Sequence, residues 1–330
     1  MSTTTMDNEP TPVGMRSTCA VPPGDDRLFA THVTAGDCDV SRLEAALRGD
    51  RVVLIEGAAP EDADRIVGGI AERFGLLEGL EKQAAFAAIH GHRQNSGRYF
   101  MSVNQRRDYQ SIAIHSEGTH FLNFQLAAVY CYENTTDGGV TVLLNTDQGS
   151  GDWRRVREIV VRLQPGGPEL SPTQRERIKV GFQMDPLKDV LTADDQVLEE
   201  VRSPVEGRRF FRVSSQLRKR YSVILDREVY AYWDNIDRAV SNTESEYAHL
   251  LRSLRLFREA PGAASGPPSS APVSRDGSAT MIGYERLFRA MIVRKLVPGE
   301  LMIQNNLTWT HSASHWTPGS GSRKLVVAFA

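Results

Sequence analysis

The 330-residue chain is predicted to adopt a mainly β fold with flanking helices, a β sandwich or barrel wrapped by helices. Short apolar runs rich in β-branched residues cluster between about residues 98 and 145 and again near the C-terminus. Helical periodicity is found mainly at the start and in the middle of the chain. No internal repeat or strong domain boundary is visible. Residues 27–330 are therefore expected to form a single domain.

Composition limits the classes of function. Hydrophobic residues make up 40% of the chain and charged residues 24%, as in ordinary globular proteins, and the net charge is −2. This charge predicts neither a nucleic-acid nor a membrane-surface partner. Three cysteines without CxxC spacing support neither a disulfide framework nor a zinc knuckle. The N-terminus lacks a basic start followed by an apolar core, and no run of 18 apolar residues occurs, so a cytoplasmic protein is expected.

The first part of the chain predicts an arm followed by alternating helices and strands. Residues 1–26 are rich in Thr, Pro, Gly and Asp and lack periodicity, which predicts a disordered N-terminal arm. Residues 40–47 are expected to be helical, and the apolar run 51–55, which ends before Gly57, is expected to be a buried strand. Apolar spacing predicts an amphipathic helix over 62–74, closed by a glycine.

The remaining elements follow in order. Strands are expected at 100–103, 111–115, 125–132, 140–144, 210–213, 221–225, 300–304 and 323–330. Helices are expected at 153–163, 239–257 and 285–296. Residues 259–280 form a low-complexity insertion of Pro, Gly, Ala and Ser, which predicts either disorder or a mobile cover over a site.

The stretch His115-Ser116-Glu117 carries the main chemical signal. An imidazole and a carboxylate two residues apart on a strand point to the same face, so both could bind one ion. A third ligand from a distant strand, His311, would complete a set of two histidines and one carboxylate, which suits non-haem Fe(II). The chain has eight histidines, so such a pair also arises by chance. Apolar neighbours at 112–114 and 121–124 favour a partly buried site over a polar pair on an exposed edge.

Other histidines were weighed as ligands. His315 competes with His311 for the third position, although it is only eight residues from Arg323. His120 has an odd offset from His115, which places it on the opposite face of a continuous strand. His90 and His92 have no matching partner, and we interpret them as structural.

The C-terminal part contains a matching series of features. Pro298-Gly299 forms a predicted turn before an apolar strand, and Asn305-Asn306 forms the next corner. His311 follows, and Arg323 lies twelve residues beyond it at the start of the last predicted strand.

This order resembles the Fe(II)- and 2-oxoglutarate-dependent dioxygenases of the taurine dioxygenase and clavaminate synthase-like family. There, a His-x-Asp or His-x-Glu pair precedes a Gly-Gly-x-Thr segment, a Pro-Gly-Asp turn, an Asp-Asn corner, a histidine and an arginine. The corresponding elements here are His115-Ser116-Glu117, Gly138-Gly139-Val140-Thr141, Pro298-Gly299-Glu300, Asn305-Asn306, His311 and Arg323. The likeness extends loosely from about residue 27 to the C-terminus and is sharp only at these motifs.

The resemblance implies a double-stranded β-helix, or cupin-like jelly-roll, with iron held by His115, Glu117 and His311. It also implies that 2-oxoglutarate chelates the metal, while its far carboxylate contacts Arg323 and the hydroxyl of Thr141, which suits the bidentate hydrogen bonding of a guanidinium. Two departures are Glu instead of the commoner Asp at 117 and Asn instead of Asp at 305. A one-residue slip in the last strand would exchange Arg323 with Lys324.

The resemblance further implies an oxygenase with O₂ and 2-oxoglutarate as co-substrates. Its substrate would be a small molecule, an amino acid or amino-acid derivative of specialised metabolism, either free or attached to a carrier protein. Hydroxylation, desaturation or cyclisation is expected, and halogenation is not, because Glu117 leaves chloride no vacant ligand position. Substrate contacts are expected at Ser102, Asn104 and Arg106, just before the metal pair. Two alternatives stay open: a zinc- or manganese-dependent enzyme that is not an oxygenase, and a non-enzymatic β-barrel binding protein.

Overall fold

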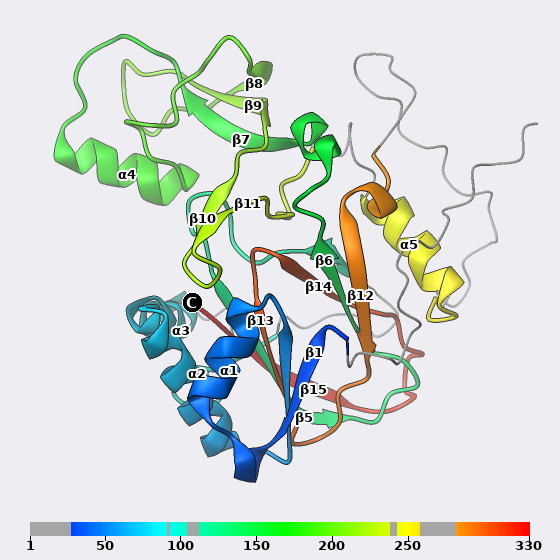
Figure 1. Ribbon diagram of the computed structural model, residues 1–330. Helices are drawn as coiled ribbons and strands as arrows, with labels where there is room; N and C mark the ends of the chain where they lie inside the picture. Colours follow the sequence, from blue (N-terminus) through cyan, green and yellow to red (C-terminus); the bar gives the residue numbers. More distant parts are fainter. Residues whose placement is uncertain (1–27, 91–92, 104–111, 238–242, 258–281) are drawn as a thin grey trace, which may run out of the picture.

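Two β-sheets form the centre of the computed structural model, which describes residues 28–90, 93–103, 112–237, 243–257 and 282–330 (Figure 1). The larger sheet has six strands in the order β1-β2-β13-β5-β15-β3, and the smaller has four in the order β12-β6-β14-β4. Neighbouring strands are antiparallel except β1 and β2. The prediction of a mainly β fold with flanking helices is confirmed.

The bounds of these strands show that the chain passes repeatedly between the two sheets. The larger sheet contains β1 (Ala30–Thr34), β2 (Val52–Glu56), β3 (Met101–Ser102), β5 (Leu126–Asn134), β13 (Leu301–Asn305) and β15 (Arg323–Phe329). The smaller sheet contains β4 (Ile112–His115), β6 (Thr141–Thr146), β12 (Phe288–Arg294) and β14 (Trp309–Ala313). Consecutive strands therefore change sheet at each step from β3 to β6 and again from β12 to β15.

An apolar layer joins the inner faces of the two sheets. It includes Cys131 and Leu325 of the larger sheet together with Leu143 and Trp309 of the smaller one. Because strand residues alternate between faces, their neighbours in sequence point outward. The outer face of the larger sheet is covered by helices α1 (Val40–Arg48), α2 (Pro60–Arg73) and α3 (Leu77–His90). Helix α5 (Thr243–Ser253) covers the outer face of the smaller sheet.

A second, smaller unit lies away from these sheets, at the top of Figure 1. It consists of the three strands β7 (Arg157–Leu163), β8 (Gln196–Val201) and β9 (Phe210–Gln216), which we call the accessory sheet, and helix α4 (Pro172–Phe182). Its own apolar cluster includes Ile178 and Phe210. The short strands β10 (Arg220–Ser222) and β11 (Arg227–Val229) lead the chain back toward the two main sheets.

Two predicted helices are wrong. Residues 153–163 form a short 3₁₀ turn, η2 (Gly151–Arg155), followed by strand β7, and residues 285–296 form the turn η3 (Tyr284–Arg286) followed by strand β12. Both segments contain β-branched runs, Ile159-Val160-Val161 and Ile292-Val293, and each finds a strand partner far along the chain, β9 and β6 respectively. Tertiary pairing therefore outweighed the helical spacing of their apolar residues.

The other predictions have mixed outcomes. The helices expected over 40–47 and 62–74 are present, the described part of 239–257 contains α5, and strands lie near all nine predicted positions, 51–55 included. Strands β1, β7, β8, β11, β12 and β14 and helices α3 and α4 were not predicted. The arm 1–26 and the insertion 259–280 lie outside the described residues. No helix in the described ranges combines the length and apolar content needed to cross a membrane.

Candidate metal centre

The structure brings together the three residues predicted as metal ligands. Strand β14 pairs with β4 so that His311 lies directly opposite His115, and Glu117 follows two residues after His115. The Glu117 Oε1 atom lies 3.7 Å from His115 Nε2 and 3.4 Å from His311 Nε2. One ligand atom from each residue lies within 4.8 Å of the other two. This convergence joins positions almost two hundred residues apart.

Local contacts orient the ligand atoms. The Nδ1 atom of His115 lies 2.9 Å from the carbonyl oxygen of Ala113, which turns Nε2 toward Glu117. Burial acts to lower the pKa of His115, but the contact with Glu117 outweighs it and the pKa is raised. Burial likewise acts to raise the pKa of Glu117, but both imidazoles outweigh it and hold this pKa far below its usual range. Glu117 is therefore a carboxylate that two imidazoles stabilise, and a divalent cation bound between the three side chains would compete with the proton on His115.

The residues fit a transition metal. Two imidazole nitrogens and one carboxylate oxygen lie close together in the lining of a cavity of about 420 Å³, within the usual size of small-molecule sites. This donor set suits Fe(II) and related divalent ions, and the remaining coordination positions would face the cavity.

The cavity also contains the predicted co-substrate residues, Thr141 and Arg323. Arg323 makes no ion pair with any residue in the described ranges; it donates one long hydrogen bond, 3.4 Å, to the carbonyl of Gly139 and lies over Trp316. Burial lowers the pKa of its guanidinium to about 10, so it is a cation at neutral pH. Thr141 is opposite Ala313, two residues from His311 in β14, and its hydroxyl bonds to no other described residue.

The neighbouring candidates point elsewhere. Lys324 is exposed and its ammonium lies over the ring of Tyr132, on the outer side of the larger sheet, so Arg323 is the cation that faces the cavity. His315 packs against Phe257, and His120 contacts Asp189; neither belongs to the ligand cluster. The side chain of His90, and His92 as a whole, lie outside the described residues.

Sequence reasoning missed a residue that holds the predicted ligand Glu117 in place. The Asn306 side chain, which is fully buried, accepts a hydrogen bond from the Glu117 N–H and donates one to the Glu117 carbonyl, both 2.9 Å long. It also donates to the Phe124 carbonyl at 2.8 Å. Asn306 therefore anchors both ends of the segment 117–124. Its place in the Asn-Asn corner was visible in the sequence, but its partners were not.

Steric constraints explain why glycine occupies both of the first two positions of the Gly-Gly-x-Thr segment. A Cβ atom on Gly138 would lie 1.9 Å from the backbone carbonyl oxygen of His315, which leaves no room for a side chain. Gly139 has a φ of +61°, and a Cβ there would lie 2.8 Å from the Arg323 side chain. Gly138 thus lets the chain pass close to the backbone of His315, and Gly139 lets it pass close to the Arg323 side chain.

The predicted substrate residues lie only partly in the described ranges. Asn104 and Arg106 fall outside them. The Ser102 hydroxyl accepts a hydrogen bond from the Gln94 N–H at 2.9 Å, and the next residue, Val103, lines the cavity. Two further charged residues, Arg93 and Asp234, also line it, and sequence reasoning did not identify either.

Comparison with models of known protein families gives no match, and neither does comparison with curated proteins. Among solved structures, the chain is similar to PvcB, an Fe, alpha-ketoglutarate dependent oxygenase from an isonitrile synthetic pathway, with 12% identity over 91% of this chain and 85% of that one and a TM-score of 0.39. The chain is also similar to the non-heme iron oxygenase OrfP in complex with Fe, with 11% identity over 90% of this chain and 81% of that one and a TM-score of 0.42. A third similar structure is AAD-2 in complex with Mn(II) and N-oxalylglycine, with 13% identity over 92% of this chain and 94% of that one and a TM-score of 0.37. Values this low leave the function to be inferred from the residues of the cavity.

Proposed function

We propose that this protein is an Fe(II)- and 2-oxoglutarate-dependent oxygenase. The proposal is carried by one observation: the cavity that contains His115, Glu117 and His311 also contains a cation, Arg323, that pairs with no carboxylate in the described part of the chain. A partly buried guanidinium without a counter-ion is costly, and a bound carboxylate would relieve that cost. Thr141 lines the same cavity, and its hydroxyl supplies a further donor.

The strand arrangement supports the corresponding fold, a double-stranded β-helix. In such a jelly-roll, eight strands form two facing sheets, and the chain crosses between them. Strands β3 to β6 and β12 to β15 alternate between the sheets in this manner, with the accessory sheet and α5 inserted between β6 and β12. The proposed ligands lie on β14 and at the end of β4, and both strands belong to the smaller sheet.

The residues divide the work between holding the metal and holding the co-substrate. Bound Fe(II) would supply the activation of O₂, coupled to oxidative decarboxylation of 2-oxoglutarate to succinate. His115, Glu117 and His311 would occupy one face of the ion and leave the other face to ligands from the cavity. Arg323 and Thr141 would bind the far carboxylate of 2-oxoglutarate and so fix its orientation toward the metal.

We infer that the substrate is a small zwitterion, an amino acid or a derivative of one. Arg93 and Asp234 give the cavity one further cation and one further anion. The Arg93 guanidinium lies over the Phe329 ring, which stacks on the imidazole of His311. Asp234 contributes to raising the pKa of His115, so its charge acts on the other histidine. A cation and an anion in the lining of one cavity suit the carboxylate and the ammonium group of one molecule.

The test begins without substrate. Anaerobic Fe(II) plus 2-oxoglutarate should give a weak visible charge-transfer band, and under O₂ the protein should form succinate. A zinc- or manganese-dependent hydrolase or a binding protein would give neither. Full turnover by the Glu117→Ala variant without an added carboxylate would contradict the ligand assignment.

The substrate is then sought among amino acids. Succinate formation should be coupled to a product that gains one oxygen or loses two hydrogens. N-acetyl and methyl-ester forms of an accepted amino acid should lose this stimulation, because each removes one charge. Arg93→Gln should raise the KM for the substrate and leave the 2-oxoglutarate band unchanged. Equal turnover of the blocked forms would refute the zwitterion.

A further inference from the structure

The segment that follows the metal ligand Glu117 forms one side of the metal site. Gly118 lines the cavity, and at the other end Phe124 stacks on Phe329 at 6.0 Å, with Phe329 stacked in turn on His311 at 6.4 Å. The segment 118–124 is thus in contact with the site at both ends. Its local hydrogen bonds include Asn123 N–H to the Thr119 carbonyl, which hold its turn but do not attach it to the rest of the protein.

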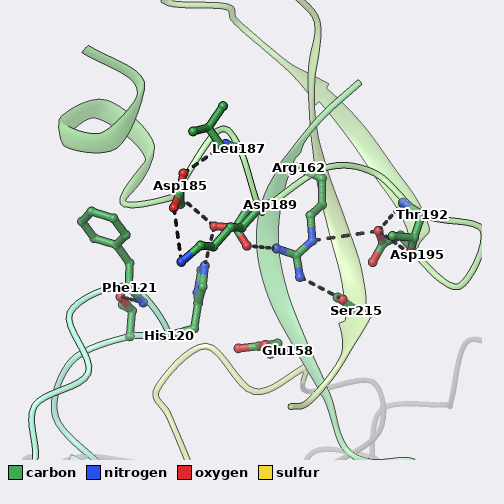
Figure 2. A network of polar contacts seen from close by, with 12 residues as sticks. His120, Phe121, Glu158, Arg162, Asp185, Leu187, Asp189, Thr192, Asp195 and Ser215 are labelled. Atoms are coloured by element: carbon green, nitrogen blue, oxygen red, sulfur yellow. Dashed lines mark hydrogen bonds and ion pairs between the residues drawn. The ribbon is translucent and has the colours of Figure 1, made fainter. Parts of the chain in front are cut away.

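At its middle, this segment contacts the loop that follows α4. Figure 2 shows the imidazole of His120 pointing from its own segment toward Asp189, with His120 Nε2 and Asp189 Oδ2 3.5 Å apart. The His120 side chain is only 10% exposed, and Asp189 is its one charged partner among the described residues. Neither nitrogen of the His120 ring has a hydrogen-bond partner in the described part of the chain, so the contact with Asp189 is the polar contact that stabilises this imidazole, and removal of Asp189 should release it.

Asp189 is itself rigidly held. Its Oδ1 atom accepts a hydrogen bond from Arg162 of β7 at 2.6 Å, and its Oδ2 atom accepts one from the Asp185 N–H at 2.8 Å. Arg162 is 4% exposed and also donates to Ser215 of β9 at 3.2 Å (Figure 2). The accessory sheet therefore presents Asp189 to His120 as a fixed point rather than as a flexible surface carboxylate.

The chain that returns from the accessory sheet makes a second contact with the same region. The Ser116 N–H donates to the Tyr232 carbonyl at 2.7 Å, and Ser116 forms a bridge with Trp233. Asp234, the next residue, lines the cavity. The accessory sheet is thus connected to the metal site on both sides of Glu117.

We propose that Asp189 is a positioning residue for the metal site, which fixes the segment 118–124 through His120 and so keeps Glu117 and Gly118 in their places. Through this contact, the accessory sheet determines the order of the wall beside the metal. The inference rests on the metal site of the proposed function, but not on the identity of the co-substrate or substrate.

Asp195 provides a matched control. It is also a buried aspartate beside Arg162, with Asp195 Oδ2 3.9 Å from Arg162 Nε, and its side chain is 2% exposed. It accepts hydrogen bonds from Thr192, not from the metal-site segment. Asp195→Asn therefore perturbs the accessory sheet without touching His120.

The experiment compares Asp189→Asn, His120→Asn, the double variant and Asp195→Asn by two readouts. Hydrogen exchange should speed up at least tenfold in a peptide covering 118–124 in the first three proteins, and stay at the wild-type rate in Asp195→Asn. Titration with Co(II) should give a dissociation constant raised about three- to tenfold in the same three, because metal binding must then order the segment. The double variant should bind Co(II) no more weakly than either single variant, since the two substitutions remove the same contact.

The outcomes separate the two proposals. If wild-type protein binds no Co(II), the proposed metal site fails, and the exchange data still test the role of Asp189. If Co(II) binds but Asp189→Asn matches Asp195→Asn in both readouts, the positioning role is refuted while the metal site stands. Additive effects of Asp189→Asn and His120→Asn would also refute it.

Discussion

Replacement of Asn306 by alanine tests how the fold holds its proposed metal ligand. The variant removes the hydrogen bonds to the Glu117 N–H, the Glu117 carbonyl and the Phe124 carbonyl. Each hydrogen bond is worth about 1 kcal/mol net, and the groups left behind are partly buried, so the free energy of unfolding should fall by about 3 kcal/mol. Since Glu117 would then have to be ordered by the metal itself, metal affinity should fall about 10- to 100-fold.

The assay is a titration of the metal-free protein with Co(II), followed by its visible absorption, with chemical denaturation measured in parallel. A tenfold to hundredfold loss corresponds to about 1.4–2.7 kcal/mol of binding free energy. The affected quantity is the dissociation constant of the metal, measured on protein whose circular dichroism matches that of the wild type.

Asn305→Ala is the control. Asn305 is equally buried and makes two side-chain hydrogen bonds, to the Leu307 N–H and to Ser222, but none to Glu117. The Asn305→Ala variant should lower the free energy of unfolding by about 2 kcal/mol and keep the metal dissociation constant within about twofold of the wild-type value. If Asn306→Ala folds and binds Co(II) as tightly as Asn305→Ala does, the anchoring role of Asn306 is wrong.

Three further outcomes are expected. Arg323→Met should raise the KM for 2-oxoglutarate about 100-fold, with partial recovery in Arg323→Lys, because one or two charge-assisted bonds are lost; an unchanged KM in steady-state succinate assays would contradict the co-substrate site. Because Glu117 raises the pKa of His115 above its ordinary value of 6.5, a metal ion must displace a proton from this imidazole. The affinity for Co(II) should therefore decline by about tenfold per pH unit as the pH falls below the raised pKa of His115. An affinity that stays constant between pH 5 and 8 would exclude this competition. Gly138→Ala should lower the free energy of unfolding by more than about 2 kcal/mol, because its Cβ would overlap the His315 carbonyl; Gly36→Ala, with no atom within 4 Å of its Cβ, should stay within about 1 kcal/mol in the same denaturant titration.

The sequence by itself predicted which residue types make up the candidate site. Ligand type and spacing are local properties, so His115 and Glu117 could be identified as a pair on one face of a strand. The arginine at 323 and the glycines before Thr141 were identified from motif order. Short apolar runs likewise predicted seven strands of the central sheets, but not β1, β12 or β14.

Only the tertiary structure decided which distant groups these residues meet. Residues 157–163 and 288–294 have apolar runs compatible with helix or strand, and the presence of β9 and β6 as pairing partners made them strands. The contacts of Asn306 with Glu117 and of His120 with Asp189 join segments 189 and 69 positions apart, respectively. A buried amide or carboxylate looks like any other polar residue until its partner is in place, because its role depends on the geometry of pairing and not on its own neighbours in the chain.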